Sequence, residues 1–126
     1  MREFSVEMNE LSSPWKVARH KEKLEAYLRG EPVYPVTLEL DITTACNREC
    51  PGCPSASGPF SRNLDMAFIR HLFSLIGGRT KGLLLTGGEP TISPIFPDVL
   101  REARRSGFEE IAVVTNGSFL AEEKVA

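Results

Sequence analysis

The chain has 126 residues, of which 41% are hydrophobic and 25% charged, as expected for a single soluble globular domain. Its formal net charge of -2 and isoelectric point near 5.7 give no basic footprint, so a nucleic-acid partner is not supported. No apolar run approaches the roughly 20 residues that cross a bilayer, and the first residues lack the apolar segment of a signal peptide. We therefore expect a cytoplasmic protein with no membrane partner.

An N-terminal helix is expected before the main domain. Ser13-Pro14-Trp15 is typical of an N-cap followed by a helix start, and Gly30 is typical of a helix end. We therefore expect residues 1–33 to form a helical extension and residues 34–126 to form the core domain.

The first predicted strand covers residues 36–42, where apolar and polar side chains alternate. Its polar face carries Glu39 and Asp41, which is unusual because central strands of parallel sheets are normally apolar on both faces. Two interpretations remain open. The polar face meets solvent, or it lines a polar cavity.

Three cysteines follow this strand, spaced as Cys-x-x-x-Cys-x-x-Cys at Cys46, Cys50 and Cys53. They are the only cysteines of the chain, and three thiols cannot pair completely into disulfides. Turn-forming residues fill positions 51–59, so the cysteines are expected on a loop. Three thiolates on one loop can hold a metal ion or an iron–sulfur cluster, one ligand short of the usual four.

The remainder of the chain alternates between predicted helices and strands. A helical period over residues 64–76 ends at Gly77-Gly78, and a second helix from about Pro97 ends at Gly107. Buried strands are expected at residues 83–86 and 111–115. Such strand–helix repeats form parallel sheets, whose ligands gather at the carboxyl ends of the strands. The cysteine loop and the residues after the next two strands all fall on that edge.

The second strand runs into Gly87-Gly88-Glu89-Pro90. Two glycines leave the backbone bare for close approach of a small ligand, and Glu89 can neutralise an amine. The alternative is a tight turn with a solvent-facing acid. Asn116, at the end of the third strand, is a further candidate for the same cavity.

The cysteine triplet after a first strand, with Gly-Gly-Glu-Pro after a second, resembles the radical S-adenosylmethionine (radical SAM) superfamily. The likeness covers residues 34–117. It implies an α/β fold of parallel (βα) repeats similar to the first half of a partial TIM-type (βα)6 barrel, preceded by the N-terminal helix. It also implies an enzyme that cleaves S-adenosylmethionine reductively to a 5′-deoxyadenosyl radical, which abstracts hydrogen from a substrate that the sequence does not identify.

The resemblance also implies roles for individual residues. Cys46, Cys50 and Cys53 would bind a 4Fe–4S cluster, and S-adenosylmethionine would chelate its fourth iron. The methionine amino group would be received by residues of the second motif, with Asn116 nearby; these residues are Gly87, Gly88, Glu89 and Pro90. No catalytic side chain is identifiable beyond the cluster ligands. An external electron donor such as flavodoxin or ferredoxin is implied as a partner.

The chain departs from the family pattern in two respects. Gly52 stands before the third cysteine, where the family commonly has an aromatic residue beside the adenine, so Phe60 is a candidate to replace that contact. The core domain is also expected to be truncated after its third strand. Exposed sheet edges then predict self-association.

Two other functions remain open. The three cysteines could hold zinc in a non-catalytic module, completed by His20 or His71, although neither histidine has conventional spacing. Alternatively, a truncated family member could serve as a binding or assembly module without turnover.

Overall fold

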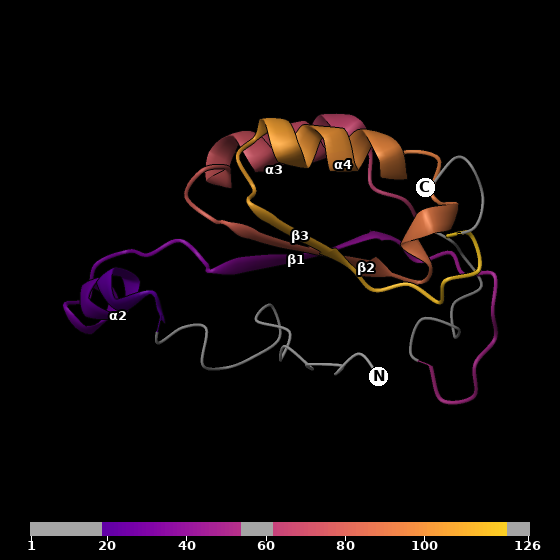
Figure 1. Ribbon diagram of the computed structural model, residues 1–126, viewed down its shortest axis with the longest axis horizontal. Coiled ribbons are helices and arrows are strands. Elements are labelled where there is room, and N and C mark those ends of the chain that lie inside the picture. Colours follow the sequence, from indigo (N-terminus) through magenta and orange to yellow (C-terminus); the bar gives the residue numbers. More distant parts are fainter. Residues whose placement is uncertain (1–18, 54–61, 121–126) are drawn as a thin grey trace, which may run out of the picture.

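The computed structural model describes residues 19–53 and 62–120, in which strands and helices alternate (Figure 1). The predicted start of the N-terminal helix and Phe60 lie outside the described residues. The division into an extension and a core domain stays a prediction. The elements are α2 (Lys21–Leu28), β1 (Thr37–Thr43), α3 (Met66–Ile76), β2 (Gly82–Gly87), the 3-10 helix η2 (Pro90–Ile92), α4 (Phe96–Arg105) and β3 (Glu110–Val113).

The three strands form one parallel sheet in the order β1-β2-β3. Leu40, Leu85 and Val113 are aligned across it. Both crossover helices, α3 and α4, lie over the same face of the sheet (Figure 1). This confirms the predicted α/β class, and the open three-stranded sheet is consistent with part of a (βα) barrel.

The hydrophobic core fills the space between the sheet and the two helices. Phe73 of α3 packs edge-on against Phe108, with ring centroids 4.9 Å apart. Asp65 caps α3 by accepting a hydrogen bond from the Phe68 N–H at 2.8 Å. The buried apolar residues are Ile42, Ile69, Phe73, Leu83, Leu85, Phe96, Val99, Ala103 and Phe108.

The opposite face of the sheet is not covered by any described helix (Figure 1). The predicted alternation of β1 is confirmed, because Leu38 and Leu40 pack against the core while Glu39 and Asp41 are exposed. This one-sided arrangement agrees with the sequence pattern. That the acidic face lines a barrel lumen stays a prediction.

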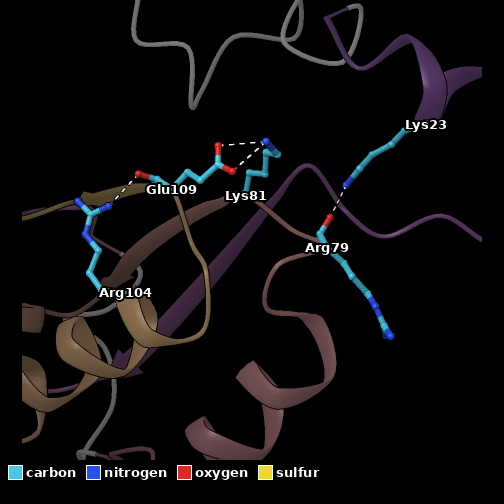
Figure 2. Close-up of polar contacts among 5 residues, drawn as sticks. All are labelled: Lys23, Arg79, Lys81, Arg104 and Glu109. Carbon is cyan, nitrogen blue, oxygen red and sulfur yellow. Dashed lines mark hydrogen bonds and ion pairs between the residues drawn. The ribbon is translucent and has the colours of Figure 1, made fainter.

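Lysine and arginine side chains connect elements at the amino edge of the sheet (Figure 2). Lys23 of α2 donates to the carbonyls of Tyr34, Pro35 and Arg79 at 2.8 to 3.1 Å. These bonds tie α2, which has no buried residue, to the start of β1 and to the turn after α3. None of the described helices has the length and apolar character needed to cross a membrane.

Candidate functional site

The exits of the three strands meet at the carboxyl edge of the sheet, where the sequence placed its motifs. The Gly88 N–H donates to the Thr43 carbonyl at 2.9 Å, and the Glu89 N–H donates to the Ala45 carbonyl at 2.8 Å. The Asn116 N–H donates to Glu89 Oε2 at 2.7 Å. The structure therefore brings together the cysteine loop, residues 87–90 and the end of β3.

The two glycines allow β2 to pass close to the exit of β1. Gly87 has a φ of +132°, and a Cβ added there would lie 2.1 Å from the Thr43 carbonyl oxygen. At Gly88 the added Cβ would lie 2.2 Å from the Ala45 oxygen. Any side chain would thus push the two exits apart. The neighbour that requires these glycines is the backbone leading into the cysteine loop, and their approach to a ligand stays a prediction.

Glu89 lies at the centre of this edge and is only 1% exposed. Its Oε1 accepts hydrogen bonds from the Thr91 N–H at 3.1 Å, the Thr91 hydroxyl at 2.5 Å and the Thr115 hydroxyl at 2.7 Å. With the Asn116 N–H on Oε2, the carboxylate accepts four hydrogen bonds. This burial overturns the alternative in which Glu89 is a solvent-facing acid.

These hydrogen bonds also set the charge of Glu89. Burial raises the pKa of the carboxyl, but the hydrogen bonds from Thr91, Asn116 and Thr115 outweigh burial and hold the pKa below its ordinary value. The side chain is therefore ionised at neutral pH. A fixed negative charge beneath this edge suits a ligand with a positively charged group.

The cysteines lie on a loop that is closed at its base by two bonds between Thr44 and Arg62, at 2.8 and 2.9 Å. All three thiols are free. Cys46 and Cys53 are half-buried and Cys50 is exposed. The Cys53 N–H donates to the Cys50 carbonyl at 3.1 Å. Free thiolates on an accessible loop are donors suited to iron or zinc.

The thiols do not converge on one point in this structure. Within residues 19–53 and 62–120, no three histidine, cysteine or acidic side chains form a group placed to hold a metal ion. His71 is exposed on α3, and His20 precedes α2 at the amino edge, where it lines a hollow with Arg79 and Lys81. Neither histidine joins the cysteines in such a group. The donor set fits a cluster, and its three-cysteine assignment stays a prediction.

The end of β3 also holds the cysteine loop from the side. Asn116 Nδ2 donates to Asn47 Oδ1 at 2.9 Å, and Arg48 donates to the Ser118 hydroxyl at 3.0 and 3.3 Å. The sequence pattern predicted Asn116 as a site residue but did not predict Asn47, Arg48, Ser118 or Thr115. These four could have been found from their position in the sequence, because each lies within three residues of a predicted motif residue.

Comparisons with known proteins match the sequence of this chain to a family and to named relatives. The model of the radical SAM superfamily matches residues 40–126. The chain is 30% identical to a GTP 3′,8-cyclase of Chlorobaculum tepidum over 86 residues, in an alignment that covers 66% of this chain and 26% of that protein. It is 35% identical over 89 residues to a GTP 3′,8-cyclase of Moorella thermoacetica, covering 66% of this chain and 28% of the relative.

Another relative is named for a different reaction. It is a 7,8-dihydro-6-hydroxymethylpterin dimethyltransferase of Methanocaldococcus jannaschii, 26% identical over 87 residues in an alignment that covers 65% of this chain and 17% of that protein. The chain thus spans less than a third of the length of each of these three relatives.

Proposed function

Because the chain belongs to the radical SAM superfamily, we propose that the carboxyl edge of its sheet is the cofactor site of a radical S-adenosylmethionine enzyme. Cys46, Cys50 and Cys53 would hold a 4Fe–4S cluster through their thiolates, leaving the fourth iron for S-adenosylmethionine. When bound, the reduced cluster and S-adenosylmethionine supply the one-electron chemistry that removes a hydrogen atom from a substrate. An external one-electron donor would reduce the cluster.

One observation carries this proposal: the buried, ionised Glu89 joins the second motif to the end of β3, directly beside the cysteine loop. Three motifs far apart in the sequence thus share one edge, as a cofactor that contacts several strands requires. The donor set adds support, because three thiols leave one position of a four-ligand site open.

Residues 87–90 and Asn116 would surround the methionine part of S-adenosylmethionine. Glu89 Oε2 accepts a hydrogen bond from the Asn116 N–H, and a carboxylate oxygen has two lone pairs, so an ammonium group can still be received there. Gly87 and Gly88 would contribute main-chain carbonyls, with Pro90 fixing the turn into η2. Asn116 would border the same space.

The exposed acidic face of β1, on the side of the sheet opposite α3 and α4, would line a cavity for cofactor and substrate. Glu39→Gln with Asp41→Asn should leave the free energy of unfolding within about 0.5 kcal/mol, because both side chains are exposed. The same pair should lower S-adenosylmethionine cleavage or substrate turnover in the protein reconstituted with its cluster. Unchanged cleavage and turnover would refute a cavity role for this face.

The substrate is left unassigned, because the relatives differ in the reactions that their names state. Because this chain resembles both a cyclase and a methyltransferase, the comparison supports the cofactor chemistry common to the family and not the product of either relative.

Anaerobic reconstitution with iron and sulfide tests the proposed site. The chain should turn brown and take up about four irons and four sulfides, and each Cys→Ser variant should lose most of both. His20→Ala and His71→Ala serve as matched controls and should leave the uptake unchanged. Stoichiometric zinc without sulfide, or zinc lost in either histidine variant, would replace the cluster with a zinc site. Formation of 5′-deoxyadenosine under strong reductant then tests turnover.

A further inference from the structure

We propose that the hydrogen-bond chain Glu89–Asn116–Asn47 makes Cys46 the anchored ligand of the cysteine loop, around which Cys50 and Cys53 close. This inference rests on the proposed function, since it assigns unequal roles to the three ligands proposed above. It adds Asn47 and Asn116 as positioning residues, which act on the site through Cys46.

Asn116 is fixed by three hydrogen bonds of its own. Its N–H donates to the buried Glu89 carboxylate at 2.7 Å, and its Oδ1 accepts from the Ser118 N–H at 3.0 Å. Its remaining group, Nδ2, donates to Asn47 Oδ1 at 2.9 Å. Because the bond to Glu89 is charge-assisted, part-buried and made to a buried carboxylate, the end of β3 is a firm support for the partner on the loop.

Cys46 is held on both sides by this support. Asn47 follows it directly, and the carbonyl of the preceding Ala45 accepts from the Glu89 N–H at 2.8 Å. The Ala45 N–H also donates to Thr43 Oγ1 at 3.0 Å. The residues on either side of Cys46 are therefore tied to β1, to the turn after β2 and to the end of β3, Ala45 through its backbone and Asn47 through its side chain.

The other two cysteines are held less firmly. Among the described residues, segment 49–53 is held by an internal hydrogen bond, from the Cys53 N–H to the Cys50 carbonyl. The three thiols also do not form a metal-binding group in this structure. Bringing them to one cluster therefore requires a rearrangement, and the segment with fewer ties is the one that moves.

The Asn47–Asn116 pair permits a sharp test, because an amide can either donate or accept. In Asn47→Asp the carboxylate still accepts from Asn116, and in Asn116→Asp the amide of Asn47 can turn and donate. Each single variant thus keeps a hydrogen bond. The double variant N47D/N116D has no donor between two like charges. Asn47→Leu removes the acceptor without adding charge. Ser118→Ala removes the two bonds from Arg48, which are exposed like the Asn47–Asn116 bond but do not involve Asn47.

The measurement is the rate at which iodoacetamide alkylates each cysteine of the metal-free chain. Peptide mass spectrometry identifies and quantifies the modified cysteine. Asn47→Leu and the double variant should raise the Cys46 rate about 2- to 10-fold, the effect of one lost hydrogen bond on a local opening equilibrium. The single Asp variants and Ser118→Ala should stay within about 2-fold, and Cys50 should react equally in all.

An unchanged Cys46 rate in Asn47→Leu and in the double variant would overturn the inference. So would an equal rise at all three cysteines, because that reports a general loosening of the loop. This assay contains no cluster, so its outcome is separate from the proposed function. If the alkylation rates change as predicted but the chain takes up no iron and sulfide, the anchoring of Cys46 stands and the proposed cluster site is refuted.

Discussion

Replacing Glu89 by Gln should destabilise the chain by about 2 to 4 kcal/mol, since hydrogen bonds to a charged group contribute about 1.5 to 3 kcal/mol and an orphaned buried donor costs about 1 to 3. The carboxylate accepts from two backbone N–H groups, one on each oxygen, those of Thr91 and Asn116. A Gln side chain has one acceptor oxygen. Either orientation of its amide therefore faces one of these N–H groups with a donor.

Urea denaturation at pH 7 measures this loss as a lower midpoint at unchanged slope. Glu109→Gln is the matched control, because Glu109 has a 62% exposed side chain paired with Lys81, and its loss should stay below about 1 kcal/mol. A loss below about 0.5 kcal/mol for Glu89→Gln would refute the reasoning that the buried carboxylate holds the three strand exits together.

The same variant predicts a pH dependence. The folded pKa of Glu89 lies below its ordinary value, so its charge contributes stability above the unfolded pKa of about 4.3, and that contribution is lost as pH falls through the folded pKa. The stability gap between the wild type and Glu89→Gln should be constant from pH 6 to 8 and narrow below about pH 4.5. A gap that widens on acidification would contradict the assigned direction of the shift.

Two further substitutions test local geometry by the same denaturation assay. Gly88→Ala should cost about 2 kcal/mol or more, because the new Cβ would lie 2.2 Å from the Ala45 oxygen. At Gly30 an added Cβ meets nothing within 4 Å, so Gly30→Ala measures the strain of a side chain at a φ of +73° without a close contact. Equal losses at the two glycines would argue against the close contact. Asp65→Ala should cost about 1 kcal/mol through loss of the α3 cap, and an unchanged midpoint would show that the cap contributes nothing.

Local patterns were sufficient to predict the order of elements and the edge that carries the motifs. The alternation in β1 placed Glu39 and Asp41 on the exposed face, and glycines predicted where α3 and α4 end. These features depend on residues close in sequence, where period and backbone preference act directly. The third strand was expected to reach Thr115, but it ends at Val113, and the Thr115 hydroxyl donates to Glu89.

The hydrogen bonds of the site could not be predicted in the same way. The four donors to Glu89 come from residues 2, 26 and 27 positions away, and the Asn47–Asn116 bond spans 69 positions. Such contacts depend on the register of three parallel strands, which no local period specifies. Sequence reasoning therefore identified Glu89 as a candidate for a ligand while missing that it organises the protein edge itself.

We predict that the carboxyl edge of the sheet holds a 4Fe–4S cluster in which one iron has no cysteine ligand. Electron paramagnetic resonance of the reconstituted, reduced chain, recorded with and without S-adenosylmethionine, tests this claim most directly. A reduced 4Fe–4S signal that shifts when S-adenosylmethionine is added would show a ligand at the open position, and the shift should disappear in Gly88→Ala. A chain that binds zinc and gives no such signal, or a cluster signal that S-adenosylmethionine leaves unchanged, would contradict the account.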